Sequence, residues 1–229
     1  RGQDGRVTGW MKQRLSRLLA HDINLFAYHL PLDAHPELGN NAQLGRLLGL
    51  QATLRFGEQD LGFMGSAPAA LSNPQAVASH VEKTLKRPVT LVAPEKKAIK
   101  KIAWCTGGAQ GYFESAIAAG ADVFITGEIS EPQAHLAREC GVAFIACGHH
   151  ASERYGAPAV AAHIAAQCGL THTFIEIDNP AIRSAPPRST VTKAPTVGSG
   201  LRSRSTRRAA RCAMDSSAMA SRTAWFSSR

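Results

Sequence analysis

The sequence predicts an α/β fold built around a mixed, largely parallel sheet, and three observations favour this class. From residue 99 onward, short apolar runs alternate with segments of helical character. The apolar runs are almost unbroken, which is typical of strands buried on both faces of a parallel sheet. Polar and glycine-containing motifs follow three of these runs, at the strand ends where such sheets bind ligands.

The first third of the chain is expected to begin with a helix and a strand. Apolar side chains recur at intervals of about four residues over 9–20, which indicates an amphipathic helix. Residues 23–33 form an apolar, aromatic run that includes Pro31, and this pattern favours a buried strand. A short helix is expected over 40–50, where asparagine can cap the first turn.

The remaining elements follow in a regular order. Two strands separated by a charged turn are expected over 52–67. A helix is expected over 72–87, because Pro74 lies in the first turn and valines recur on one face. Further strands are expected over 89–93, 99–107, 122–128, 142–148 and 172–178, and further helices over 110–121, 131–140 and 153–169.

The net charge of +9 arises entirely in the last 48 residues. Residues 1–181 contain 16 Lys or Arg and 16 Asp or Glu, whereas residues 182–229 contain ten Lys or Arg and one acid, Asp215. This tail is rich in serine, alanine and arginine and has no sustained hydrophobic period, so a disordered segment outside the fold is expected. Two origins stay open: out-of-frame translation, or a basic tail that binds nucleic acid through its phosphates.

The composition otherwise predicts a soluble, cytoplasmic protein. No stretch approaches the roughly 18–20 unbroken apolar residues that span a bilayer, and no secretory leader pattern opens the chain. The cysteines form no CxxC pair and lie mostly in apolar surroundings, which predicts reduced, buried thiols rather than a disulfide framework. The five are Cys105, Cys140, Cys147, Cys168 and Cys212.

The segment "ACGHHASERYG" (146–156) places two histidines and a glutamate where a strand gives way to a helix. If a helix begins near His150, His149 and Glu153 are one turn apart and can share a face. Imidazole nitrogen and carboxylate oxygen are ligands for Zn, Mn, Fe or Ni, so the pair can hold one ion. The same pattern also fits a capping box in which Glu153 bonds backbone N–H groups.

A second polar cluster, "YHLPLDAHPELGNN" (28–41), follows the apolar run that contains Pro31. It concentrates His29, Asp33, His35 and Glu37 within nine residues. A solvated loop explains such a cluster equally well when it is considered alone. Because both clusters follow a predicted strand, we expect them to meet at one edge of the sheet.

Two further motifs lie at the ends of the strands predicted over 99–107 and 122–128. "CTGGAQG" (105–111) opens a predicted helix, so Gly107 and Gly108 form a possible anion-binding loop, although the motif matches neither common nucleotide fingerprint. "ITGE" (125–128) brings Glu128 to the same edge, where it is expected to line the site. The sequence contains no GxSxG, which disfavours a serine hydrolase.

Taken together, "YHLPLDAHPELGNN", "AWCTGG", "GADVFITGEISE" and "GHHASERYG" resemble the bacterial GTP cyclohydrolase 1 type 2 homologues, a YbgI-like family. The resemblance runs from about Gly2 to Ala181. It implies two similar α/β lobes, a homohexameric ring, and two divalent metal ions (Zn, Mn, Fe, Ni or Mg) in the cleft between the lobes. The lobes would be residues 1–93, including a connecting segment, and residues 94–181, followed by the tail 182–229.

The resemblance also implies which residues form the site. The family's ligating aspartate, histidine and glutamate fall on Asp33, His149 and Glu153. The residues lining that site would be His29, His35 and His150. A paired-histidine motif expected in the first 60 or so residues of the family has no counterpart, so this chain is expected to hold one metal ion or none.

Three functions therefore remain open. The first is a metal-dependent hydrolase acting on a nucleotide-like substrate, in which two cations activate a water molecule. The second is a non-catalytic metal-binding ring protein that acts through assembly or partner interaction. The third is a nucleic-acid-associated protein that uses its basic tail, and the neutral body of the chain argues against it.

Overall fold

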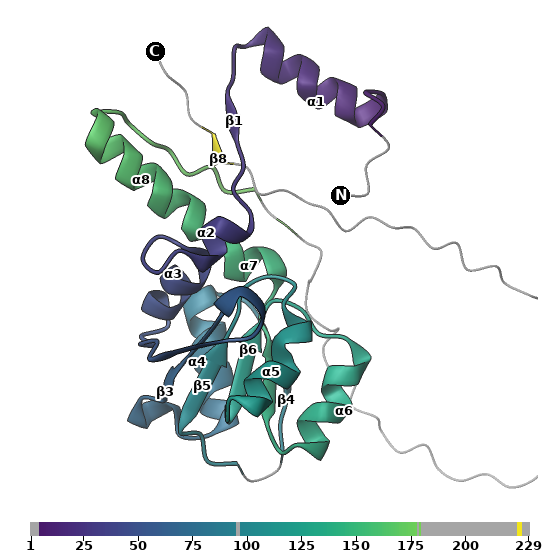
Figure 1. Ribbon diagram of the computed structural model, residues 1–229, viewed down its shortest axis with the longest axis vertical. Coiled ribbons are helices and arrows are strands. Elements are labelled where there is room, and N and C mark those ends of the chain that lie inside the picture. The colour runs from purple at the N-terminus through teal and green to yellow at the C-terminus, as the bar shows by residue number, and fades with distance from the viewer. Residues whose placement is uncertain (1–4, 95–96, 178, 180–223, 226–229) are drawn as a thin grey trace, which may run out of the picture. The chain divides into compact units, whose positions relative to one another are not determined.

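The computed structural model describes residues 5–94, 97–177, 179 and 224–225. At its centre lies a six-stranded sheet (Figure 1). In spatial order its strands are β2 (Leu54–Phe56), β3 (Gly62–Ser66), β5 (Lys101–Trp104), β6 (Val123–Thr126), β7 (Ala143–Ala146) and β4 (Thr90–Val92).

The sheet is mixed, which confirms the α/β class. The three central strands β5, β6 and β7 are parallel, as the alternation of strands and helices predicts. The outer strands β2, β3 and β4 join by antiparallel pairing. Strands from both sides of the expected boundary at residues 93 and 94 thus share one sheet, and the division into two lobes stays a prediction.

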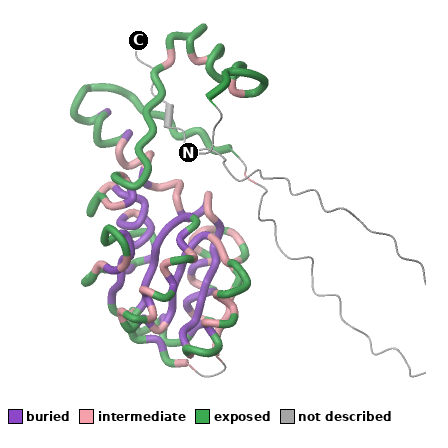
Figure 2. The backbone as a smooth tube through the Cα atoms, turned by 45° about the vertical axis from the view of Figure 1, so that its right-hand side comes forward, coloured by how far each residue is buried: buried purple, intermediate pink, exposed green. Residues whose placement is uncertain are grey.

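The central strands are buried on both faces, as their unbroken apolar character predicts (Figure 2). One face carries Ile102, Ile125 and Ile145 and packs against α4 (Pro74–Leu85) and α3 (Asn40–Leu47). The other face carries Phe124 and Phe144 and packs against α5 (Phe113–Ala118) and α6 (Glu131–Glu139). This two-sided core fixes the ends of the three parallel strands, where the polar motifs lie.

Short helices surround the sheet's edge. The helix expected over 153–169 is α8 (Gly156–Cys168), and a separate short helix, α7 (His149–Glu153), precedes it, with a break at Arg154 and Tyr155. α3 packs against α7, α8 and α2 (Leu30–Ala34). Single-turn 3₁₀ helices lie at Glu58–Asp60, Ala69–Leu71 and Gln110–Tyr112.

Two expected strands are wrong. Residues 23–33 give a two-residue strand, β1 (Leu25–Phe26), with both residues exposed, and then continue into α2. Pro31 lies in the first turn of that helix, where its missing N–H has no helical partner to lose. Residues 172–177 are exposed but form no strand, because no described strand pairs with them.

The ends of the chain differ from the sheet in burial. α1 (Gly9–Ala20) is the expected helix, yet it buries none of its residues. β1 pairs antiparallel with β8 (Ala224–Trp225). Apart from these two residues, the expected tail over 182–229 lies outside the described residues.

The cysteine prediction is partly wrong. Cys105 and Cys147 are buried, but Cys140, directly after α6, and Cys168, the last residue of α8, are exposed. Cys212 lies outside the described residues. Among the helices that the structure describes, none has the length and apolar character needed to cross a membrane.

Candidate metal centre

The His149 imidazole lies between two carboxylates. Its Nε2 is 3.0 Å from Glu153 Oε2, one turn along α7, and its Nδ1 is 2.5 Å from Glu128 Oε1. The Glu153 side chain is 6 % exposed, whereas the Glu128 side chain is 39 % exposed. The sequence-predicted pairing of His149 with Glu153 is therefore present, and Glu128 joins it.

Backbone hydrogen bonds beyond the sheet hold the three motif-bearing loops together. The Gly148 N–H donates to Gly127 O at 2.8 Å, and the Gly127 N–H donates to Gly107 O at 2.9 Å. Each bond joins loops that follow neighbouring parallel strands, so the ladder of the sheet continues into the site. This is why motifs 20 or more residues apart meet at one edge.

Glycine is required where these loops approach the site. Gly107 has a φ of +75°, and a Cβ at this position would collide with Glu153 Oε1. A Cβ at Gly127 would lie 2.5 Å from Gly107 O and 2.7 Å from His149 Cα. The "CTGG" and "ITGE" glycines thus allow the backbone to lie directly against the histidine and the glutamate.

Ser152 connects α7 to the same loops. Its Oγ accepts a hydrogen bond from the Gly107 N–H at 2.9 Å and donates to His149 O at 2.9 Å. The helix begins after Gly148, which provides no side-chain cap. The capping box that the sequence also allowed is not the arrangement seen, because Glu153 contacts the imidazole of His149.

The two carboxylates favour a positive charge at His149. The hydrogen bond that the His149 ring donates to the Glu153 carboxylate raises the pKa of the imidazole to about 9, against the opposing effect of burial and with further help from Glu128. At neutral pH the ring therefore carries a proton on both nitrogens. The electrostatics of the site are those of a cation-binding position.

Asp33 reaches this region from α2. It is 6 % exposed, and its Oδ1 accepts a hydrogen bond from Asn40 Nδ2 at 2.7 Å. Burial, together with the charges of Asp33 and Glu153, raises the pKa of the Cys105 thiol to about 12. Both carboxylates thus act on one thiol at the end of β5. Even so, the described ranges contain no three His, Cys, Asp or Glu side chains arranged to hold a metal ion.

The three lining histidines have different surroundings. His29 precedes α2 and is exposed. The Nδ1 of His35 accepts hydrogen bonds from the N–H groups of Glu37 and Leu38, which closes the turn after α2. His150 Nε2 is 3.4 Å from Glu176 Oε1, and Glu176 also pairs with Arg154. Their predicted role as lining residues stays a prediction.

The role of Gly107 and Gly108 as an anion-binding loop stays a prediction. The Gly107 N–H already donates to Ser152 Oγ. A Cβ at Gly108 would lie 3.5 Å from a carboxylate oxygen of Glu128, so this part of the loop adjoins negative charge. Repulsion from that carboxylate disfavours an anion there.

Sequence reasoning missed the polar residues that support the site. Asn40 and Asn41 are 3 % and 0 % exposed, and each uses both ends of its amide in hydrogen bonds. The sequence signal for both asparagines is the "GNN" that ends the Asp33 cluster, but this pattern by itself predicts only a helix cap. Ser152 was equally hidden between the two presumed ligands.

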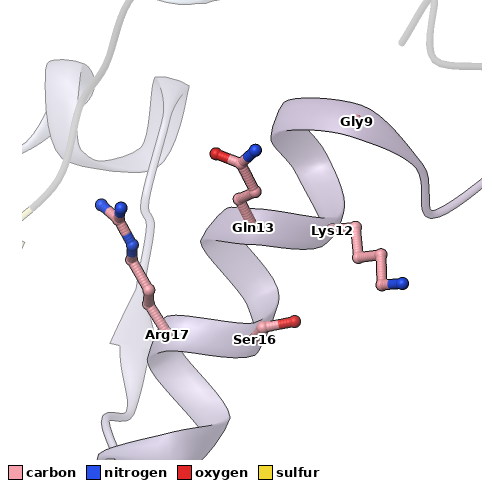
Figure 3. A pocket seen from close by; sticks show the side chains of 5 residues that line it. All are labelled: Gly9, Lys12, Gln13, Ser16 and Arg17. Carbon is pink, nitrogen blue, oxygen red and sulfur yellow. The ribbon is translucent and has the colours of Figure 1, made fainter.

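Two hollows lie near described elements. One of about 290 Å³ adjoins Glu128 and is also lined by Arg87, Thr90 and Gly148. The other, of about 550 Å³, follows α1, where the side chains of Lys12, Gln13, Ser16 and Arg17 point in different directions around the helix (Figure 3). Because these side chains do not converge, only the first hollow is relevant to the site.

Comparison with known proteins identifies the family. The model of the Duf34/NIF3 (NGG1p interacting factor 3) family matches residues 2–180, which is most of the chain. The chain belongs to the Duf34/NIF3 family. A member from Neisseria meningitidis, called a GTP cyclohydrolase 1 type 2 homolog, is 51% identical over 175 residues, covering 76% of this chain and 70% of the relative.

Solved structures of this family share the fold. The structure titled protein ybgI, of unknown function, is 43% identical with a TM-score of 0.73, covering 79% of this chain and 72% of that one. TTHA1606 from Thermus thermophilus is 30% identical with a TM-score of 0.69, covering 78% and 71%. The family recognised from the four sequence motifs is thus confirmed, and the match of its model ends at residue 180.

Proposed function

We propose that this chain binds a divalent metal ion through Asp33, His149 and Glu153 and acts as a metal-dependent hydrolase on a nucleotide-like substrate. The observation that carries the proposal is the position of His149, with Glu153 on Nε2 and Glu128 on Nδ1. Histidines that ligate metals commonly donate their second ring N–H to a carboxylate, which orients the ring. Glu128 is suited to that role.

The donor chemistry fits a divalent cation. Nitrogen from His149 and oxygen from two buried carboxylates form a mixed set that suits Zn, Mn, Fe or Ni. The absence of a Cβ at Gly107 lets the backbone lie against Glu153 Oε1, so the carboxylate is confined to one position. A cation would replace the proton that His149 now shares with Glu153, because both are attracted by the same negative charge.

Each residue has a separable task in this proposal. Glu128 holds the Nδ1 proton and leaves Nε2 directed at Glu153. Asp33 and Glu153 supply negative charge from buried positions, where water screens it weakly. A bound divalent ion would supply an activated water and polarise a substrate oxygen. The resemblance implies a second ion, for which this chain offers no further ligand among the predicted residues.

The names of the relatives support a nucleotide-like substrate. The relatives at 43–51% identity are called GTP cyclohydrolase 1 type 2 homologs. A nucleotide hydrolase of this kind attaches the hydroxide of water to a carbon of the imidazole ring of the base, the bond from that carbon to a ring nitrogen breaks, and the nitrogen takes the proton, so the opened product contains one added water. The hollow of about 290 Å³ beside Glu128 contains Arg87 in its lining, whose guanidinium can attract an anionic substrate.

Metal binding is tested by removing the carboxylate that faces His149. We expect the parent chain to bind Mn²⁺ saturably and Glu153→Ala to bind it at least 10-fold more weakly, with an unchanged circular dichroism spectrum. Glu139→Ala is the matched control, because Glu139 is an exposed glutamate at the end of α6. Equal Mn²⁺ affinity in the Glu153→Ala protein and the parent would sink the proposal.

Turnover is a separate measurement. The Mn²⁺-loaded parent is incubated with GTP, and the products are separated by chromatography and identified by mass spectrometry. Formation of a product that contains one added water and depends on Glu153 supports the hydrolase. Metal binding without turnover favours instead the non-catalytic metal-binding protein.

Assembly is the second candidate role, and the exposed apolar side chains favour it. Trp10, Leu19 and Phe26 are 55 %, 82 % and 51 % exposed on α1 and β1, and Ile175 and Ile177 are similarly exposed. Exposed apolar surface of this kind commonly marks an interface. We propose a homohexamer, as the resemblance implies, and light scattering after size-exclusion chromatography tests it. A monomer at all concentrations would exclude the ring for this chain.

A further inference from the structure

We propose that Asn40 is a positioning residue that fixes the Asp33 carboxylate relative to the His149–Glu153 pair. This inference rests on the proposed metal centre and names a residue that holds it together. The side chain of Asn40 is 3 % exposed, so its hydrogen bonds form away from water. It touches Asp33 directly and contacts neither His149 nor Glu153 in the hydrogen bonds of the described residues.

Both ends of the Asn40 amide are engaged. Its Nδ2 donates to Asp33 Oδ1 at 2.7 Å, and its Oδ1 accepts from the Gly156 N–H at 2.8 Å. An amide is suited to this position, because one side needs a donor for a carboxylate and the other needs an acceptor for an N–H. Removing the side chain leaves a buried carboxylate oxygen and a buried N–H without these partners.

The amide spans the two halves of the proposed site. Asp33 lies on α2, whereas Gly156 opens α8 three residues after Glu153. Asn40 is the first residue of α3, which packs against α2, α7 and α8. One side chain thus joins the element that carries the aspartate to the segment that carries the histidine and the glutamate.

Close packing leaves the Asn40 amide little freedom. A Cβ at Gly156 would lie 2.6 Å from Asn40 Oδ1 and 3.0 Å from its Cγ. A Cβ at Gly39, the residue before Asn40, would collide with Leu32 O and lie 2.5 Å from His35 O. Gly39 therefore lets the start of α3 lie against the carbonyl groups of α2, and Gly156 lets α8 lie against the Asn40 amide.

The neighbouring asparagine provides an internal contrast. Asn41 Nδ2 donates to Leu61 O at 3.0 Å, and its Oδ1 accepts from the Thr106 N–H at 2.7 Å. Asn41 Nδ2 also lies 3.5 Å from Asp33 O and 4.0 Å from Cys105 Sγ. None of these partners is a carboxylate, so Asn41 supports the fold. Asn40 differs because one of its partners is the carboxylate of a presumed ligand.

The first test removes the amide. We expect Asn40→Ala to weaken Mn²⁺ binding by about 10-fold or more, the usual effect of losing a group that orients a ligand. The matched control is Asn73→Ala, which removes an exposed amide that caps α4 by accepting from the Ala76 N–H. The control is expected to lower the melting temperature and to keep the parent's dissociation constant.

A second variant covers the case in which Asn40→Ala does not fold. Gly156→Ala keeps the amide but places a methyl group against Asn40 Oδ1, and we expect weaker Mn²⁺ binding from it as well. Gly111→Ala is the matched control, because a Cβ there meets nothing within 4 Å. Parent-like Mn²⁺ affinity in Gly156→Ala and in any folded Asn40→Ala protein would overturn the role of Asn40.

A metal-free measurement separates this inference from the proposed function. In protein labelled with ¹³C at the aspartate carboxylates, the Asp33 resonance, assigned with Asp33→Asn, is expected to move in Asn40→Ala and to stay in Asn73→Ala. An unmoved resonance would contradict the contact on which the inference rests. A parent that shows no saturable Mn²⁺ binding would instead overturn the proposed metal centre, and with it the positioning role.

Discussion

Two regions of the chain both contain large apolar side chains but differ in how far these are buried. In the parallel strands, Phe124 and Phe144 are fully buried, whereas Trp10 and Phe26 near the amino terminus are 55 % and 51 % exposed. The strands are covered on both faces by helices from this chain, and α1 buries none of its residues. Apolar sequence therefore indicates a segment that can be buried, and a partner surface decides whether it is.

The largest effect is expected in the aromatic cluster under α5. Phe124 stacks on Phe113 with ring centroids 5.9 Å apart and meets Phe144 edge to face at 5.7 Å. Phe124→Ala is expected to reduce the free energy of unfolding by about 3–5 kcal/mol, through lost burial and the cavity left behind. Urea unfolding followed by circular dichroism measures it, and Trp10→Ala, on the exposed helix, is expected to change it by less than about 0.5 kcal/mol.

Phe124→Leu provides a milder version if the alanine variant does not fold. It retains most of the apolar volume, so a smaller loss of unfolding free energy is expected, on the order of 1–2 kcal/mol. Similar losses for the Phe124 and Trp10 variants would remove the contrast between the two regions.

The next effect concerns the loops that join the sheet to the site. Gly127→Ala would place a methyl group 2.5 Å from Gly107 O and 2.7 Å from His149 Cα. Because both are backbone atoms, the loops must move apart, and a loss of about 1–3 kcal/mol in unfolding free energy is expected. The same displacement is expected to weaken Mn²⁺ binding, and calorimetry of the variant checks both. An unchanged melting temperature would show that these loops are looser than their hydrogen bonds indicate.

The sequence predicted the buried strands better than the exposed apolar segments. The three parallel strands were predicted well, because each of these apolar runs finds its neighbours within the same sheet. The run over 23–33 was misassigned, because its apolar pattern resembles a strand whether or not a partner exists, and Pro31 fits a helix start as well as a strand end. The strand expected over 172–178 failed for the same reason.

The candidate site was predictable where donor atoms are spaced within one helix. His149 and Glu153 meet because residues four apart share a face of α7. The contribution of Asn40 could not be read in the same way, since its partners Asp33 and Gly156 are 7 and 116 residues away. Such long-range contacts depend on how α2, α3 and α8 pack, which the local pattern does not encode.

A smaller, pH-dependent effect is expected at the amino-terminal end of the parallel strands. Asp122 is partly buried, which alone would raise its pKa, but the N–H groups of Lys100 and Lys101 and the ammonium of Lys97 outweigh this and lower the pKa below 3.8. A carboxyl with a lowered folded-state pKa stabilises the fold above its unfolded pKa. That stability is lost as the pH falls below 3.8 and through the lowered value.

Asp122→Asn tests this interaction. The variant is expected to lose about 1 kcal/mol of unfolding free energy at pH 7, because the charge-assisted hydrogen bonds become neutral ones. Its stability is also expected to fall less steeply than that of the parent as the pH is lowered from 5 to about 3. Parallel pH profiles for the variant and the parent would show that Asp122 does not contribute to acid unfolding.

The smallest effect is expected on α1, the exposed member of the two regions compared. Leu19 is 82 % exposed, so Leu19→Ser is expected to change the unfolding free energy of the isolated chain by less than about 0.5 kcal/mol. If the chain assembles through this surface, the same substitution removes apolar area from an interface, and the stability of the assembly then depends on protein concentration. Melting curves recorded over a 100-fold range of concentration therefore distinguish the two cases. A melting temperature that rises with concentration in the parent and not in Leu19→Ser identifies α1 as an interface, whereas concentration-independent curves for both show that it is free surface in this chain.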